Sequence, residues 1–196
     1  MWTKFPAMLE LNFAPFPVLE SDRLRLVQFE ERHLEAMFLL RTSDDVMRFV
    51  ERPRPENIEE VREMLMNNKE LAEKKEGIVW VVELKEEQIL AGTIGFWRMK
   101  KEHHRAEIGY MILPQYWKQG IMSEALREVL RYGFDVMRLH SIEADINPEN
   151  SASATILERN GFSREAFFKE NFYWKGKYLN SAIYSLLVQD YKSSLK

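Results

Sequence analysis

The sequence contains no cysteine, and this absence excludes disulfide bonds, thiolate metal sites and a cysteine nucleophile. It also lacks any apolar run of about eighteen residues, so no membrane-spanning helix is expected. The first twenty residues carry three prolines and the acidic Glu10, and they lack the continuous apolar core of a signal peptide. These absences predict a cytoplasmic protein with no membrane association.

Neither sign of charge dominates the chain. The net charge is -3 and the sequence pI is about 5.9, which argues against a general binder of nucleic acids or membrane surfaces. With 196 residues, 45% of them hydrophobic and 30% charged, the composition is typical of one globular domain without repeats or low-complexity linkers. We expect a domain over residues 18–190, an N-terminal arm over 1–17 and a C-terminal tail over 191–196. The oligomeric state stays open, a homo-oligomer included.

Hydrophobic periodicity predicts a mixed α/β fold. A strand is followed by helices, then by a strand hairpin, and then by alternating strands and helices that end in a second hairpin turning at Gly176. Because a helix connects strand 106–113 to strand 139–146, these two strands should lie parallel. The expected strands are 23–29, 78–85, 88–99, 106–113, 139–146 and a final pair, and the expected helices are 30–43, 43–50, 55–77, 119–135 and one from Ser151 to a stop at Gly161.

The stretch "LPQYWKQGIMSEAL", residues 113–126, begins its helix in an unusual way. A glycine and a cation stand where capping chemistry favours Asp, Ser or Thr. Free backbone N–H groups at such a helix start bind phosphate, Gly120 lets an anion approach, and Lys118 adds positive charge. The alternative is a loop glycine beside a solvated lysine. The stretch is neither a Walker loop nor a dinucleotide fingerprint, because the required glycines and the GK[ST] ending are missing.

Three longer stretches carry a family resemblance. They are "LESDRLRLV", "SDDVMRFV" and the ordered block that runs from "AEIGYMILPQYWKQG" to "NPENSASATILERNGF". On these residues the chain resembles the GNAT superfamily of N-acetyltransferases, specifically its RimJ/RimL-like branch, over roughly residues 18–190. The resemblance implies a mostly antiparallel mixed sheet with a central, splayed parallel strand pair, flanked by helices.

The implied activity is direct transfer of acetyl from acetyl-CoA to a primary amine, without an acyl-enzyme. A protein or peptide N-terminus, as in ribosomal proteins, is the expected acceptor. A small-molecule amine such as an amino-sugar, polyamine or amino acid is the alternative acceptor. A non-catalytic acetyl-CoA-binding module is a second class of function, and a nucleotide-binding domain without acyl chemistry is a third.

The resemblance also assigns the cofactor positions. The backbone of the turn into the helix would hold the pyrophosphate, and a main-chain N–H of the preceding strand would bind the thioester oxygen while pantetheine lies in the strand gap. Only Gly120 matches the general family pattern in the turn, and the bulky Met122 replaces a small residue. The expected positions are Met111, Ile112 and Leu113 on the strand and Trp117, Lys118, Gln119, Gly120, Ile121 and Met122 in the turn.

Two polar residues of the "NPENS" stretch complete this set. The resemblance places Asn150 on the pantetheine arm and Ser153 near the thioester. Leu157 occupies the position where many relatives have a tyrosine that acts as general acid, so Ser153, an ordered water or another tyrosine must serve. A turn residue at Asn150 and a helix cap at Ser151 are the structural alternatives.

An attacking amine must be neutral, so a general base is useful. Glu107 lies on the strand that leads into the turn, and Asp145 lies five residues before Asn150, where the family often has a glutamate. Glu143 shares the strand face of Asp145. Salt bridges or a solvated strand face are the alternative role for all three. The adjacent His103 and His104 would point to opposite faces, and no metal site is expected.

Overall fold

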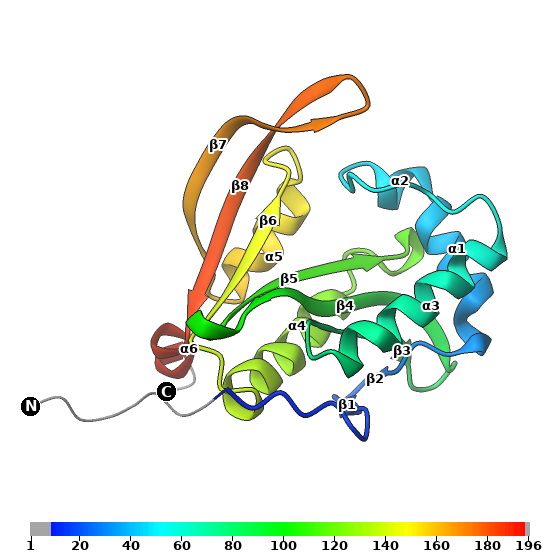
Figure 1. The fold of residues 1–196 in the computed structure, drawn as a ribbon, viewed down its shortest axis with the longest axis horizontal. Helices are drawn as coiled ribbons and strands as arrows, with labels where there is room; N and C mark the ends of the chain where they lie inside the picture. Colours follow the sequence, from blue (N-terminus) through cyan, green and yellow to red (C-terminus); the bar gives the residue numbers. More distant parts are fainter. Residues whose placement is uncertain (1–8, 195–196) are drawn as a thin grey trace, which may run out of the picture.

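The computed structural model describes residues 9–194, which form one eight-stranded sheet with helices on both faces (Figure 1). The strand order across the sheet is β1-β2-β3-β4-β5-β6-β8-β7. The strands are β1 (Leu19–Glu20), β2 (Leu24–Val27), β3 (Ile78–Leu84), β4 (Ile89–Lys100), β5 (Arg105–Ile112), β6 (Ser141–Ile146), β7 (Ser163–Trp174) and β8 (Lys177–Leu187). The α-helices are α1 (Leu34–Thr42), α2 (Asp44–Met47), α3 (Ile58–Glu73), α4 (Ile121–Arg131), α5 (Ser151–Arg159) and α6 (Val188–Ser194).

The predicted parallel pair is confirmed as β5 and β6, and all other neighbours in the sheet are antiparallel. The parallel ladder covers only three residue pairs, from Arg105↔Ser141 to Glu107↔Glu143. Beyond Glu107 the two strands part, as the diverging arrows of β5 and β6 in Figure 1 show. We call this opening the fork. Its unpaired strand edges are available to an inserted chain-like ligand.

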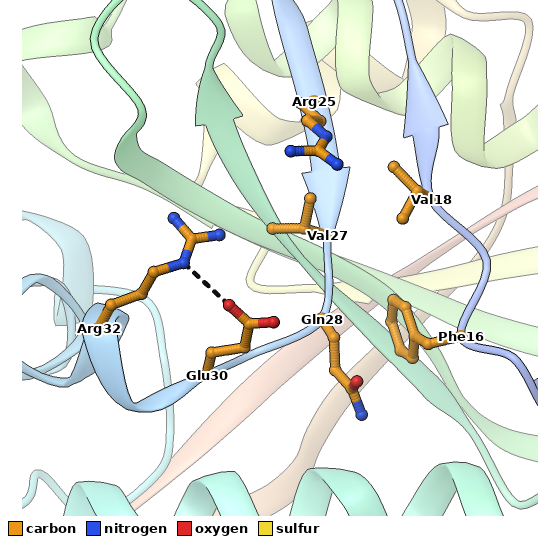
Figure 2. Close-up of a pocket in the computed structure, with 7 residues that line it drawn as sticks. All are labelled: Phe16, Val18, Arg25, Val27, Gln28, Glu30 and Arg32. Carbon is orange, nitrogen blue, oxygen red and sulfur yellow. Dashed lines mark hydrogen bonds and ion pairs between the residues drawn. The ribbon is translucent and has the colours of Figure 1, made fainter.

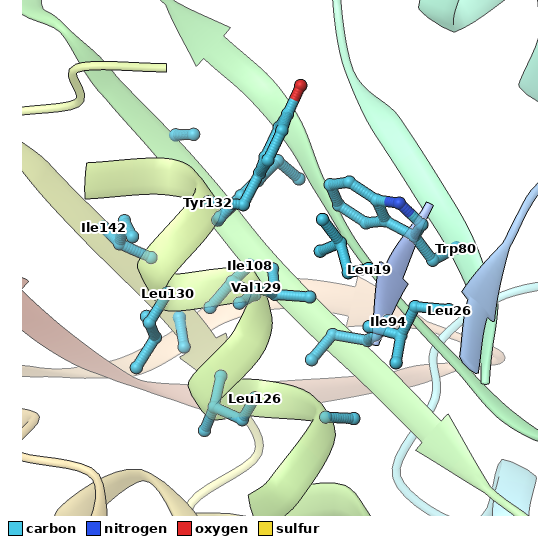
Figure 3. Packing of buried hydrophobic residues seen from close by; sticks show 14 of the residues in the cluster. Leu19, Leu26, Trp80, Ile94, Ile108, Leu126, Val129, Leu130, Tyr132 and Ile142 are labelled. Atoms are coloured by element: carbon cyan, nitrogen blue, oxygen red, sulfur yellow. The ribbon is translucent and has the colours of Figure 1, made fainter. Parts of the chain in front are cut away.

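One face of the sheet packs against α4 (Figure 3). Apolar residues of α4 recur every three or four positions, so one helix face is apolar. Leu126 and Val129 from this face are buried against Ile94 and Ile108 of the sheet. Gly133, just beyond α4, lets the Phe96 ring approach to 2.9 Å from where a Cβ would stand. This packing holds the start of α4 at the end of β5.

A second core lies on the opposite face, between α1, α3 and strands β2 to β4. It contains Leu40 from α1, Leu65 from α3 and Val81 from β3, all at most 1% exposed. Strands β6, β7 and β8 contribute no residue to this second core among residues 9–194. The helices α1 to α3 therefore cover the first half of the sheet, and this face of β6 and β8 is left for a site.

Helix boundaries differ from the expected ones where local capping decides. The helix expected over 55–77 begins at Ile58, because the Asn57 side chain accepts a hydrogen bond from the N–H of Glu60. The helix expected over 119–135 begins at Ile121 and continues past Arg131 as a π-helical turn, Tyr132–Val136. The short helix expected over 43–50 is only four residues long, but Ser43 caps it as predicted.

The two ends of the domain are partly described. Residues 1–8 of the expected arm lie outside the described residues, whereas Leu9, Leu11 and Phe16 pack against the core. The tail expected from residue 191 lies partly in α6, which continues to Ser194. No helix within residues 9–194 is both long and apolar enough to cross a membrane.

Candidate active site

The turn into α4 has the shape expected of an anion-binding helix start. Gly120 is the N-cap with φ 76° and ψ 1°, and Lys118 also has a positive φ, 58°. No side chain caps the helix, and its first helical bond runs from the N–H of Glu124 to the Gly120 carbonyl. The three preceding N–H groups therefore have no helical acceptor and point out of the helix start together with the positive end of its dipole.

The side chains around the turn leave this helix start open. Met122 is 3% exposed and packs in the core, so its bulk does not crowd the turn, and Ile121 is buried beside it. The Trp117 indole donates to the Ile112 carbonyl at 3.0 Å, which ties the turn to the end of β5. The Gln119 amide donates to the Gln115 carbonyl at 2.7 Å. Of the expected turn residues, Ile121 and Met122 can offer only their backbone.

An ion pair beneath the turn was missed by the sequence reasoning. Glu124, 8% exposed, accepts hydrogen bonds from the Ser21 hydroxyl (2.7 Å), the Arg23 N–H (3.0 Å) and the Arg23 Nε (2.7 Å). Arg23 Nη1 also donates to the Gln119 carbonyl at 3.1 Å. Burial raises the pKa of the Glu124 carboxyl, but the hydrogen bonds from Ser21 and Arg23 outweigh it, so the net pKa is lowered.

The ladder between β4 and β5 decides which backbone groups face the fork. The Leu113 N–H donates to the Ala91 carbonyl at 2.9 Å. Because bonded pairs alternate in an antiparallel ladder, the backbone of Met111 also faces β4, while those of Tyr110 and Ile112 face the fork. Of the three strand positions expected to bind the cofactor, only Ile112 thus has its N–H on the fork side.

A tyrosine and a serine meet across the fork. The Tyr110 hydroxyl lies 2.9 Å from the Ser153 Oγ, which comes from the first turn of α5. Burial raises the pKa of Tyr110 to about 12, against the lowering effect of the Ser153 hydrogen bond. Leu157 is fully buried in the core. Tyr110 is therefore a tyrosine that the structure brings to Ser153, one helical turn before Leu157.

Asn150 caps α5, a role that the sequence analysis gave to Ser151. Its side chain accepts a hydrogen bond from the Ser153 N–H at 3.1 Å, so Asn150, and not Ser151, caps α5. The cap uses the amide oxygen and leaves the amide N–H₂ without a protein acceptor among residues 9–194. Asn150 therefore orients Ser153 and still has donors to offer a ligand.

The three candidate bases differ in their partners. Glu107 accepts from the Arg98 guanidinium at 2.9 Å and from the Trp97 indole at 3.3 Å. Glu143 pairs with Arg105 at 2.6 Å and with a lysine. Both thus have the salt bridges that were the alternative to a catalytic role.

Asp145 has no salt bridge among residues 9–194 and reaches solvent, yet surrounding protein raises its pKa. Desolvation is the main cause, and the Glu51 carboxylate adds to it, whereas Ser181 and Arg98 oppose it. A carboxylate with a raised pKa and an open side is suited to accept a proton. Glu51, which approaches from the α2–α3 connection, was not among the residues expected from the sequence.

Two pockets flank the sheet. One, of about 440 Å³, is walled by the segments 47–51, 147–149 and 174–179, so it lies between the end of α2, the loop after β6 and the β7–β8 turn. We call it the hairpin pocket. The other, of about 450 Å³, lies beside β1 and β2, where the Arg32 Nε contacts a Glu30 oxygen at 2.8 Å (Figure 2). This second pocket is at the far edge of the sheet and contains none of the expected site residues.

Within residues 9–194, no group of three His, Asp or Glu side chains is arranged to hold a metal.

The fork, the uncapped start of α4 and the mixed sheet define an acyltransferase of the GNAT type. The model of the acetyltransferase (GNAT) domain matches residues 23–163, so the chain belongs to this family, whose acyl donor is acetyl-CoA. YoaA, an uncharacterized N-acetyltransferase of Bacillus subtilis, is 36% identical over 172 residues, which cover 88% of this chain and 97% of YoaA.

Two solved structures share the fold at lower identity. RimL, a ribosomal L7/L12 alpha-N-protein acetyltransferase in complex with coenzyme A, matches with a TM-score of 0.80 and 22% identity over 87% of this chain and 98% of RimL. The spermidine N-acetyltransferase of Vibrio cholerae, in complex with CoA and spermine, matches with a TM-score of 0.77 and 22% identity over 88% of this chain and 99% of that chain. The fold is thus common to enzymes for protein and for polyamine acceptors.

Proposed function

We propose that this protein transfers acetyl from acetyl-CoA to the N-terminal amine of a protein or peptide, as a RimJ/RimL-like enzyme with one catalytic domain over residues 18–190. The observation that carries the proposal is the fork, which ends at the uncapped start of α4. A pantetheine arm in the fork would meet the N–H groups of Tyr110 and Ile112, and its pyrophosphate would meet those that follow Gly120. Arg23 holds this turn through the Gln119 carbonyl.

In the transfer, the amine nitrogen bonds to the thioester carbon, and the carbon–sulfur bond breaks. Asp145 takes the proton that the amine loses, directly or through water. The Ile112 N–H, which faces the fork, donates to the developing oxyanion. The Tyr110 hydroxyl, whose pKa of about 12 keeps it protonated at neutral pH, donates to the departing thiolate and regains its proton from solvent.

Serine acylation is a less fitting route. Ser153 is bonded to Tyr110, whose raised pKa keeps the phenol protonated at neutral pH and so unable to take the serine proton. No histidine is bonded to Ser153 among residues 9–194. An activated serine needs such a base. Direct attack by the amine therefore fits the site better than an acyl-enzyme.

Two measurements test the proposal. Calorimetric titration with acetyl-CoA should show one site per chain, and absence of binding at high micromolar concentration would refute the cofactor assignment. Incubation with acetyl-CoA and a library of peptides, polyamines and amino acids, read by mass spectrometry, should show acetylated peptide N-termini. Cofactor binding without turnover of any amine would favour a non-catalytic acetyl-CoA module instead.

A further inference from the structure

Three cations line the hairpin pocket without carboxylate partners. Arg48 comes from the end of α2, and Lys175 and Lys177 come from the β7–β8 turn. No carboxylate within residues 9–194 forms an ion pair with any of them. Arg48 instead lies over the Phe49 ring, 5.1 Å from its centroid, and Lys175 lies over the Trp174 ring, 5.9 Å from its centroid. Three unpaired like charges around one pocket repel each other and attract an anionic group.

Two carboxylates, Glu51 and Glu149, line the same pocket. Glu51 accepts a hydrogen bond from the Asn147 amide at 3.4 Å, and Asn147 follows the end of β6, two residues after Asp145. Glu51 and Asp145 are close enough for the charge of one to act on the other. Since β6 borders the fork, Glu51 and Asn147 lie on the side of the pocket that leads to the reaction.

The segment that carries Glu51 is fixed to the end of α1. The Arg41 Nη2 donates to the Pro53 carbonyl at 3.1 Å, and the Arg54 Nη1 donates to the Thr42 carbonyl at 3.2 Å. These bonds hold Pro53 and Arg54, which follow Glu51 in the connection between α2 and α3. The backbone beside Glu51 is therefore held by the packed structure, whereas Arg48, Lys175 and Lys177 are exposed and can meet a ligand from solvent.

From this arrangement we infer that the hairpin pocket selects acceptors in which acidic residues follow the reacting amine, so the substrate is an acidic N-terminal peptide segment. The inference rests on the proposed function. The ammonium of the incoming acceptor is attracted to Glu51 and Asp145, and carboxylates further along the peptide meet Arg48, Lys175 and Lys177. A pocket of about 440 Å³ is within the usual range of roughly 300–1,000 Å³ for ligand sites. A polyamine would bring further positive charges to the three cations.

The inference predicts a charge preference among peptides that differ in nothing else. Hexapeptides with a free N-terminal serine carry either Asp or Lys at the next three positions, and spermidine serves as the polyamine probe. The acidic peptide should have a kcat/KM at least about tenfold higher than that of the basic peptide at low salt. The preference should shrink at about 0.5 M salt, because screening weakens interactions between exposed charges.

Charge reversal identifies the residues responsible. The double variant Lys175→Glu/Lys177→Glu should turn over the basic peptide better than the acidic one, with the KM for acetyl-CoA unchanged. Lys169→Glu is the matched control: Lys169 is exposed on β7 of the same hairpin and does not line the pocket, so the wild-type preference should persist.

Each other outcome overturns a defined part of the reasoning. Equal turnover of both peptides by the wild type, or a preference for spermidine, overturns the charge selection and leaves the acetyltransferase activity intact. A preference unchanged by the double variant removes the two lysines from the selection. If no peptide or polyamine is acetylated although acetyl-CoA binds, the proposed function fails, and the inference fails with it.

Discussion

Replacing Arg23 by Gln tests whether the ion pair beneath the α4 turn supports cofactor binding. The change removes two contacts to Glu124, at 2.7 Å and 2.6 Å, and the bond to the Gln119 carbonyl. Glu124 keeps the Ser21 hydroxyl and the Arg23 backbone N–H, so its carboxylate is not left without donors. A hydrogen bond to a charged group contributes about 1.5–3 kcal/mol.

Since the Arg23 side chain is 51% exposed, solvent screens part of this energy, and we expect a loss of about 1–2 kcal/mol in the free energy of unfolding. For a chain of this length the loss lowers the Tm by roughly 2–8 °C. The loosened turn and the unbalanced Glu124 charge should also weaken CoA binding by about tenfold, equivalent to about 1.4 kcal/mol.

The assay compares CoA with pantetheine, which lacks the phosphates. Calorimetry should show that Arg23→Gln weakens binding of CoA, whereas competition assays should show little change for pantetheine. Arg25→Gln is the matched control, because Arg25 is also 51% exposed and, within residues 9–194, pairs only with Glu20, at 3.6 Å. An unchanged Kd for CoA in Arg23→Gln, or an equal loss for CoA and pantetheine, would refute the idea that this ion pair supports the pyrophosphate turn.

Further variants test the roles of Asp145, Tyr110 and Gly120 in the candidate site. Asp145→Asn should lower kcat by about 10²–10⁴-fold and remove the acid limb of the pH–rate profile. That limb lies above pH 3.8, because the pKa of Asp145 is raised. Glu107→Gln should retain the limb. Tyr110→Phe should reduce kcat without changing the Kd for CoA, and loss of both would indicate a packing role. Gly120→Ala should destabilise the protein by about 1–2 kcal/mol, seen in urea unfolding, because φ is 76° there. The pKa of Glu124 is lowered in the folded state, so its stabilising contribution is present above about pH 4.5 and is lost as the pH falls through the folded-state pKa. The Tm difference between wild type and Arg23→Gln should therefore be full at pH 7 and shrink in acid.

Local sequence information was sufficient for much of the fold. Alternation and helical spacing depend on near neighbours, so the central strands, α3, α4 and α5 were predicted with errors of a few residues at their ends. The parallel pairing of β5 and β6 followed from the length of the connection between them. The position of Gly120 at the start of α4 was also readable, because the lack of a capping side chain is a local property.

The tertiary structure alone decided how the candidate site is assembled. The contacts that matter join residues far apart in the chain: Arg23 and Glu124 are separated by 101 positions, Glu51 and Asn147 by 96, and Tyr110 and Ser153 by 43. No local pattern encodes such a meeting, since it depends on how helices and strands pack. By itself the sequence determined the order of the main elements from β2 to β8, the apolar faces and the uncapped helix start, whereas β1 and α6 were not predicted. Packing then decided that Met122 turns into the core and that Glu107 and Glu143 are held in salt bridges, whereas Asp145 has no salt bridge within residues 9–194. The reason is that the side-chain partners of a carboxylate are set by the elements that surround it.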